Sequence, residues 1–217
     1  LNMNLNPDGS ATALSDPSTS KQGFDMVYGE DNNIYYAYSE DYNIFVQKIS
    51  NTGSVSWTAS AAASSADDIV KAIYPFPGSG CVIIYESQSF LEGSHIYAVE
   101  VSGSGQNQFS VLVSNRSGDQ YYESSALTED GVFISFKDNT SGNYDVYGQH
   151  VLFEGNLDFS PSGVAIANDG TDDQQSSSVA YDPDEDIALV CYESYDGPDT
   201  DLFCKEIILN DQTVDSE

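Results

Sequence analysis

Short apolar runs alternate along this chain with turns rich in Gly, Asp, Asn and Pro. Apolar runs bounded by turn residues predict β-strands. The runs are rich in Val, Ile, Tyr and Phe, which favour a pleated surface. No stretch combines an apolar period of 3.6 residues with helix-capping residues. The pattern therefore predicts an all-β protein.

One predicted strand recurs about every 50 residues and is followed, four residues later, by a turn glycine. Its copies read IFVQKISNTG at 44–53, IYAVEVSGSG at 96–105, VYGQHVLFEG at 146–155 and LFCKEIILND at 202–211. Their aromatic second positions are Phe45, Tyr97, Tyr147 and Phe203, at intervals of 52, 50 and 56 residues. A partial copy, LNPDG, ends at Gly9. Self-similarity at such a period indicates a repeat architecture.

Three further strands accompany each copy. A second strand precedes it and reads IYYAYSED, CVIIYES, VFISFKD and IALVCYES; another comes earlier still and reads FDMVY, VKAIY, SSALT and SSVAY. A fourth strand follows the turn glycine, as in QFSVLVS at 108–114. Some strands are apolar on both faces, as expected when a small sheet packs between two neighbours. We therefore expect a β-propeller-like fold of four repeats of about 50 residues, each with four short antiparallel strands.

The repeats are expected to form one propeller-like domain over residues 1–217. Counted from turn to turn, the repeat periods are 10–53, 54–105, 106–155 and 156–211. Two interpretations stay open: four blades that close into a ring, or a segment of a larger protein that needs neighbouring domains of the same chain to cover its outer faces.

The repeat resembles the tandem propeller-like repeats of proteins that Bacteroidetes-like bacteria secrete or display on their surface. Those repeats carry an Asp-Ile-Tyr-x-Gln-Arg-Ile strand, a turn glycine and then Trp. The matching segments here are Asn43–Ile49 with Gly53 and Trp57, and Asp145–Val151 with Gly155. The second repeat departs from the pattern at Val99 and Glu100, and the fourth has Asp211 in place of Gly. The resemblance implies a propeller-like architecture and an extracellular or cell-surface location.

The net charge of the chain limits the classes of partner that it can bind. Six Lys and Arg residues stand against 35 Asp and Glu residues, for a net charge of −29. So few basic residues cannot neutralise a phosphate backbone, which argues against nucleic acid as a partner. The same imbalance argues against an anionic membrane surface, and no run of 18 apolar residues predicts membrane insertion. An acidic surface suits surroundings rich in cations, such as high salt or extracellular calcium.

The three cysteines are Cys81, Cys191 and Cys204. If the segment between Cys191 and Cys204 folds back at its midpoint, the two cysteines lie opposite each other on antiparallel strands, near disulfide distance. We therefore predict a Cys191–Cys204 disulfide and a free Cys81. Such a bond needs an oxidising compartment, which agrees with secretion. The alternative is a pair of small buried thiols.

A calcium site is the one cofactor for which the chain offers candidates. Asp196, Asp199 and Asp201 lie in one six-residue loop, and Glu40, Asp41, Asp138 and Asp145 occupy the corresponding loops of other repeats. Carboxylates and loop carbonyls are the ligands that calcium takes. The alternative is that aspartates simply form good turns. No other cofactor is indicated.

No catalytic motif stands out. Neither histidine, His95 or His150, lies in a recognised nucleophile or zinc motif, and both are expected to be surface polar residues. We expect a non-catalytic extracellular module, structural or adhesive, of a larger surface or secreted protein, with a protein or glycan at the cell surface as its partner. One alternative is a glycan-binding propeller, in which Tyr42, Phe90, Tyr144 and Tyr195 stack on sugars. Another is a propeller-fold carbohydrate-active enzyme with a pair of carboxylates.

The acidic composition makes a prediction about stability. Millimolar calcium or high NaCl should raise the melting temperature, because cations relieve the repulsion among 35 acidic side chains. Thermal unfolding followed by circular dichroism in chelator, in calcium and across a NaCl series measures this. A melting temperature that is the same under all of these conditions would contradict it.

Overall fold

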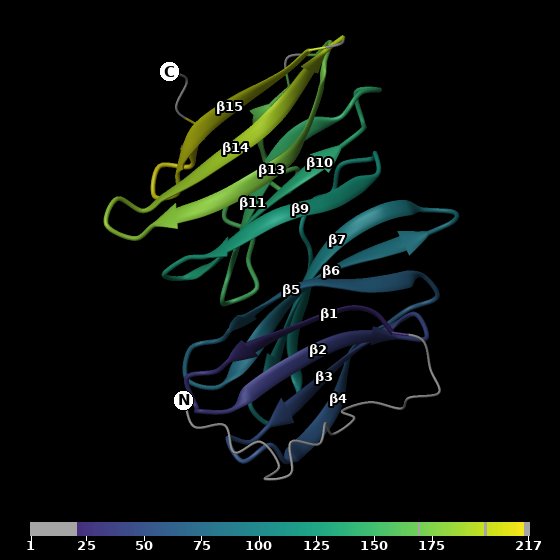
Figure 1. The fold of residues 1–217 in the computed structure, drawn as a ribbon, viewed down its shortest axis with the longest axis vertical. Helices are drawn as coiled ribbons and strands as arrows, with labels where there is room; N and C mark the ends of the chain where they lie inside the picture. The colour runs from purple at the N-terminus through teal and green to yellow at the C-terminus, as the bar shows by residue number, and fades with distance from the viewer. Residues whose placement is uncertain (1–20, 169, 198, 215–217) are drawn as a thin grey trace. The chain divides into compact units, whose positions relative to one another are not determined.

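The computed structural model describes residues 21–168, 170–197 and 199–214. These residues form sixteen strands, β1 to β16, and no helix. The strands group into four four-stranded antiparallel sheets, in each of which the strands lie side by side in chain order (Figure 1). None of the described segments is a helix long and apolar enough to cross a membrane. The predicted all-β, propeller-like fold is confirmed.

The first two sheets follow each other in the N-terminal half. The first consists of β1 (Lys21–Tyr28), β2 (Ile34–Glu40), β3 (Asn43–Ile49) and β4 (Val55–Ala63). The second consists of β5 (Asp67–Pro75), β6 (Gly80–Ser89), β7 (Gly93–Ser102) and β8 (Asn107–Leu112). Gly53 and Gly105, with φ angles of 84° and 81°, lie in the turns that join the third strand to the fourth, as predicted.

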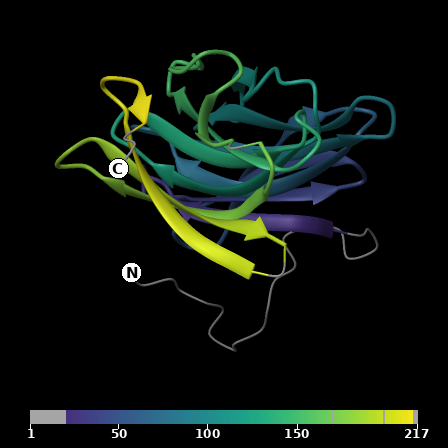
Figure 2. The ribbon, with the colours of Figure 1, turned by 90° about the horizontal axis from the view of Figure 1, so that it is seen from above.

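The other two sheets occupy the C-terminal half. The third consists of β9 (Gln120–Leu127), β10 (Gly131–Asp138), β11 (Asp145–Leu152) and β12 (Val164–Ala167). The fourth consists of β13 (Asp173–Asp182), β14 (Ile187–Asp196), β15 (Asp199–Ile208) and β16 (Thr213–Val214). Figure 2 shows the yellow-green and yellow strands of the fourth sheet from above, bent along their length. Each sheet takes its fourth strand from beyond the turn at residue 53, 105, 155 or 211, so the sheets do not coincide with the turn-to-turn periods.

The chain divides into two compact units. One contains the described residues up to Ser89 together with Ala98–Ser110, and therefore the first sheet and most of the second. The other contains Phe90–Tyr97 and the described residues from Val111 onwards, and therefore the third and fourth sheets.

The first strand of every sheet carries a β-bulge at nearly the same place. The register of pairing shifts at Gly23 in β1, Lys71 in β5, Glu123 in β9 and Ser176–Ser177 in β13. A bulge bends its strand and increases the local twist. At Gly23, with a φ of 69°, a Cβ atom would lie 2.6 Å from the Val70 carbonyl oxygen. This bulge therefore needs glycine, because β5 passes directly beside it.

Within each unit, one sheet packs face to face on the next. In the second unit, Phe133, Val146 and Ile166 of the third sheet form a buried cluster with Val190 and Tyr192 of the fourth. We call the face of the fourth sheet that packs on the third its front face, and we use the same name for the equivalent face of the other sheets. The opposite face of each sheet is its rear face. Val190 and Tyr192 thus lie on a front face, whereas Phe133 and Val146 lie on a rear face.

An equivalent hydrogen bond joins the two sheets within each unit. The Ile73 backbone N–H on β5 donates to Asp25 Oδ2 on β1, at 3.1 Å. The Val179 backbone N–H on β13 donates to Ser124 Oγ on β9, also at 3.1 Å. Asp25 and Ser124 occupy equivalent positions, because they pair with Ala37 and Ser135 on their second strands. A rear-face side chain of one sheet therefore captures an edge N–H of the next.

In the first unit, the loops at the β1–β2 end of the two sheets meet at a partly buried carboxylate, Asp31. Asp31, in the loop between β1 and β2, forms an ion pair with Lys48 Nζ at 2.8 Å. The Tyr35 hydroxyl (2.7 Å) and the Ser79 hydroxyl (3.0 Å) both donate to Asp31 Oδ2. Burial opposes ionisation of Asp31, but these hydrogen bonds outweigh it and hold the pKa of the carboxyl well below its usual range.

Lys48 extends this connection to the far edge of the second sheet. Its ammonium group donates to the Gly103 carbonyl oxygen at 3.1 Å, and Trp57 Nε1 donates to the same oxygen at 3.1 Å. Gly103 lies in the turn between β7 and β8, so one carboxylate and one carbonyl join loops from both sheets.

The Asp31 cluster predicts a pH-dependent loss of stability. Asp31→Asn should lower the free energy of unfolding at pH 7 by about 1–3 kcal/mol, because it leaves the Lys48 charge partly buried without its partner. Since the pKa of Asp31 is lowered in the folded protein, its contribution is present above the unfolded-state value of about 3.9 and is lost as the pH falls.

Urea unfolding at pH 7 and at about pH 3 measures the difference between the variant and the parent. Asp184→Asn, at an exposed hairpin position, is the control and should change little. An Asp31→Asn difference that is as large at pH 3 as at pH 7 would show that charge is not its cause.

Candidate functional site

The four hairpins between second and third strands carry the aromatic residues that were predicted to stack on sugars. Tyr42, at the β2–β3 tip, is 62% exposed, and Phe90, at the β6–β7 tip, is fully exposed. Tyr144 and Tyr195 are only half exposed. The Tyr144 ring has Lys137 Nζ 4.7 Å from its centroid, and the Tyr195 hydroxyl donates a hydrogen bond to Glu193. Only the rings of Tyr42 and Phe90 are therefore largely open to solvent.

Tyr42 is held in an unusual backbone conformation. Glu40 pairs with Asn43, so Asp41 and Tyr42 alone form the turn, with φ angles of 48° and 69°. Two consecutive residues with positive φ are typical of a type I′ turn, in which Asn-Gly and Asp-Gly are preferred. A tyrosine at the second position costs of order 1–3 kcal/mol, and strain of this kind concentrates at functional sites. The sequence places a large exposed ring where glycine would be easiest.

A hollow of about 130 Å³ lies beside this ring. It is lined by Tyr42 and five polar residues, which are Gln22, Ser39, Glu40, Asp41 and Asp67. The Glu40 carboxylate is held by Lys21 Nζ at 3.0 Å, and Ser39 Oγ accepts the Val70 backbone N–H at 2.8 Å. The hollow therefore combines one exposed aromatic face with carboxylate and amide groups, which can bind a ligand that has both apolar faces and hydroxyl groups.

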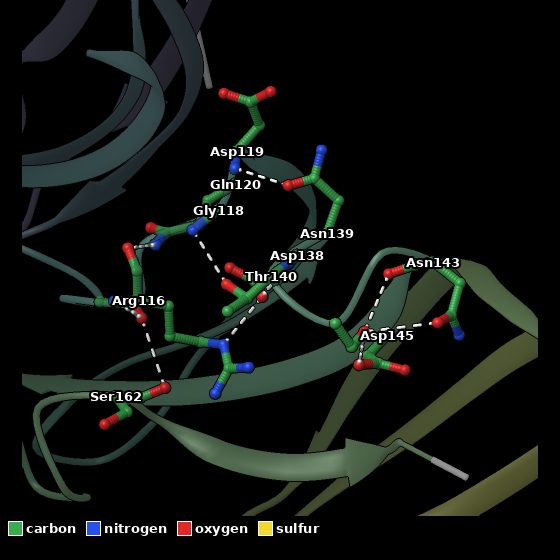
Figure 3. A network of polar contacts seen from close by, with 12 residues as sticks. Arg116, Gly118, Asp119, Gln120, Asp138, Asn139, Thr140, Asn143, Asp145 and Ser162 are labelled. Carbon is green, nitrogen blue, oxygen red and sulfur yellow. Dashed lines mark hydrogen bonds and ion pairs between the residues drawn. The ribbon is translucent and has the colours of Figure 1, made fainter. Parts of the chain in front are cut away.

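A second polar cluster lies in the other unit, where β9 begins beside the β10–β11 hairpin (Figure 3). Arg116 Nε donates to Asp138 Oδ1 at 2.9 Å, and its guanidinium carbon lies 3.7 Å from the centroid of the Tyr147 ring. The Gly118 N–H donates to Thr140 Oγ1 at 2.9 Å. A Cβ atom at Gly118 would lie 2.5 Å from the Thr140 backbone nitrogen, so glycine permits this close approach.

This cluster buries three polar side chains on one rung of the third sheet. Asp138 pairs in register with Gln120 on one side and with Asp145 on the other, and all three are at most 2% exposed. Asp145 Oδ2 accepts the Ser141 hydroxyl at 2.7 Å. Gln120 Oε1, Asp138 Oδ2 and Asp145 Oδ1 have no hydrogen-bond partner among the described residues. Arg116 compensates the charge of Asp138 but not that of Asp145. The hydrogen bonds of the cluster hold the β10–β11 hairpin in place, and its buried side chains do not reach solvent.

The candidate calcium ligands lie apart from any such cluster. Asp196 pairs with Asp199 at the tip of the β14–β15 hairpin, while Asp201 pairs with Ser194 further along. All three aspartates are exposed. Among the described residues, no three or more His, Cys, Asp or Glu side chains gather closely enough to hold a metal ion. Calcium at this hairpin stays a prediction.

Cys191 and Cys204 lie opposite each other on β14 and β15 and are joined by a disulfide, with Cα atoms 4.0 Å apart. The bond lies on the rear face of the fourth sheet, where Cys204 is exposed. Cys81 is a free, fully buried thiol. Burial, with a further contribution from Glu100, raises the pKa of this thiol far above its usual value, so it is chemically inert in the folded protein.

The prediction for His150 is wrong. His150 is 1% exposed; its Nδ1 lies 3.2 Å from Asp158 Oδ2, and its Nε2 lies 2.9 Å from Thr128 Oγ1. Burial of β11 on both faces brings the ring inside, which the polar character of histidine alone did not indicate. Thr128 is also buried, at 6% exposed, so this Thr-His-Asp arrangement has no access for a substrate.

Comparison with known proteins gives similarity of structure alone. No protein-family model matches the chain, and no curated protein matches it in sequence. The structure is similar to an endo-arabinase from Bacteroides thetaiotaomicron, with 11% identity over 83% of this chain and 72% of that one, at a TM-score of 0.44.

Two further solved structures are similar to a like extent. A protein of unknown function from Bacteroides caccae matches at 12% identity over 90% of this chain and 63% of that one, with a TM-score of 0.43. An endo-1,4-β-xylanase from Bacteroides thetaiotaomicron matches at 11% identity over 88% of this chain and 73% of that one, with a TM-score of 0.44.

The disulfide makes a direct prediction. Mass spectrometry of the unreduced protein should find the peptides around Cys191 and Cys204 linked, and Cys81 should react with an alkylating agent only after unfolding. Replacing both linked cysteines by alanine should cost about 3 kcal/mol, the loop-entropy value for a short closed loop. Three free thiols in the protein isolated without reductant would contradict the pairing.

Proposed function

We propose that this chain is a non-catalytic, extracellular binding module that holds a neutral glycan in the hollow beside Tyr42. The observation that carries the proposal is the exposed Tyr42 ring, kept at a φ of 69° next to a polar hollow. A side chain kept in a costly conformation at the surface contributes nothing to the core. The presence of a strained tyrosine at this surface position is best explained by a ligand that its ring contacts.

The chemistry of the hollow fits a sugar. The face of an aromatic ring packs against the C–H groups of a pyranose, while the Glu40, Asp41 and Asp67 carboxylates can accept hydrogen bonds from sugar hydroxyls. The Gln22 amide can both donate and accept. The hollow is small and mostly polar, so it fits one sugar unit resting on the Tyr42 ring rather than a fully enclosed ligand.

Charge favours a neutral ligand over an anionic one. Three carboxylates line the hollow, and the whole chain carries a net charge of −29. A sulfated or uronic-acid polymer would meet a repulsive potential on approach. A neutral oligosaccharide, or one with a basic amino group, would not.

An extracellular location is supported by two features. The Cys191–Cys204 disulfide requires an oxidising compartment, and the sequence resembles repeats that bacteria secrete or display at their surface. The acidic composition agrees with surroundings rich in cations. An adhesive role at the cell surface follows if the glycan belongs to another cell or to a matrix.

A carbohydrate-active enzyme is the second candidate, and the three carboxylates of the hollow favour it. A glycosidase uses two carboxyl groups on either side of the scissile bond. The binding experiment distinguishes the two candidates if the bound oligosaccharides are also analysed for cleavage.

The binding proposal makes a sharp prediction for Tyr42. On a glycan array, the parent protein should retain neutral oligosaccharides, and Tyr42→Ala should weaken binding of the best ligand by at least about tenfold, or about 1.4 kcal/mol. Tyr42→Phe should bind nearly as the parent, because it keeps the ring. Phe90→Ala, which removes an exposed ring from the equivalent hairpin of the next sheet, is the matched control and should leave binding unchanged.

Retention of no glycan, or equal binding by Tyr42→Ala, would contradict the proposal. Cleavage products that vanish in Glu40→Gln or Asp67→Asn would show instead that the hollow is a hydrolase site.

A further inference from the structure

The first sheet packs on the second through its rear face, and no sheet of the same unit covers its front face among the described residues. By the register of pairing, Tyr36 and Met26 occupy the positions that Val190 and Val179 occupy in the fourth sheet. Val190 is fully buried against the third sheet. In contrast, Phe24, Met26 and Tyr28 are 67%, 55% and 43% exposed. The same positions that form an interface in one sheet are open in the other.

This front face is aromatic and nearly free of charge. Its rings form a continuous ladder from β1 to β3, with Phe24–Tyr36, Tyr36–Tyr38 and Tyr38–Phe45 centroid distances of 6.3, 5.3 and 5.7 Å. Its charged residues, Lys21 and Glu40, neutralise each other at 3.0 Å. In a chain with 35 acidic residues, so uncharged a surface indicates contact with another protein surface.

The edge N–H that joins sheets elsewhere is also available here. Met26 is the equivalent of Ile73 and Val179, whose N–H groups donate across to the preceding sheet. The Met26 N–H donates instead to Oδ1 of its own neighbour Asp25, at 2.8 Å and exposed. It could turn to an acceptor on a packed sheet at no net loss of hydrogen bonds.

The rear face of the fourth sheet has the matching features. Ser178 pairs with Cys191, so it holds the position of Asp25 and Ser124, the two acceptors of the inter-sheet hydrogen bond. Ser178 is exposed, and Leu189 on the same face is 38% exposed. A hollow of about 370 Å³ gives room for large side chains; Ala180, Ile187 and Leu189 form its apolar part, and Asp182, Glu185 and Glu206 also line it.

We propose that the front face of the β1–β4 sheet binds the rear face of the β13–β16 sheet of a second copy of this chain. Ser178 of one copy accepts the Met26 N–H of the other, and Met26 and Tyr28 pack into the hollow beside Leu189. The contact repeats the sheet-on-sheet packing that both units already contain.

The two faces differ, so the association is head-to-tail. Every copy keeps one free front face and one free rear face, and the assembly grows into a closed ring or an open chain. The net charge of −29 opposes this at low ionic strength. At about 0.5 M NaCl the Debye length falls to about 4 Å, which screens the carboxylates of Glu193 and Glu206 on the rear face, so the apolar contact should then prevail.

Sedimentation velocity of the full chain in low and high NaCl tests the proposal. The parent should form species larger than a monomer in high salt. Met26→Glu, which damages the front face, and Leu189→Glu, which damages the rear face, should each remain monomeric. Leu91→Glu, at a hairpin tip on neither face and 89% exposed, is the matched control and should associate as the parent does.

Mixing the two damaged variants gives the decisive measurement. The front face is intact in Leu189→Glu and the rear face is intact in Met26→Glu, so an equimolar mixture should form heterodimers and nothing larger. Recovery in the mixture also shows that both variants fold. A parent that stays monomeric in high salt, or a mixture that does not associate, overturns the proposal.

Discussion

The packing of one twisted four-stranded sheet on the next is the constraint on which the rest of this structure depends. Each first strand bends at a bulge, and in β5 and β13 an edge N–H group then meets the preceding sheet of the same unit. A rear-face Asp25 or Ser124 then captures one of those N–H groups. An edge strand with unsatisfied N–H groups would be a liability in a small sheet, and this hydrogen bond removes it while fixing the register between sheets.

Most of the few basic residues of this strongly acidic chain form ion pairs with carboxylates that are wholly or partly buried. Lys48 joins loops of two sheets through Asp31 and the Gly103 carbonyl, and Arg116 compensates Asp138 inside the third sheet. Most of the remaining carboxylates face water, where repulsion is screened by salt. The basic side chains thus act as structural ties, and little positive charge is left to attract an anionic ligand.

The candidate ligand site depends on the same geometry. Glu40, Asp41 and Tyr42 are consecutive, but the hollow also needs Gln22 from β1 and Asp67 from the start of β5. Those residues meet because the second sheet packs on the first. A binding site at the hairpin end of sheets leaves their packed faces undisturbed, so ligand contacts can vary in such repeats without changing the core.

The sequence by itself determined the strands, their repetition and the hairpin pairing, because alternation, turn residues and symmetry about a turn act over short distances. The positions of Phe45, Tyr97, Tyr147 and Phe203 on the third strands followed from this, as did the facing positions of Cys191 and Cys204. Tertiary structure decided the burial of His150, the placement of Asp67 beside Tyr42 in one hollow, and the exposure of the front face of the first sheet. These depend on how bulged strands bring separate sheets together, and no local pattern encodes that contact.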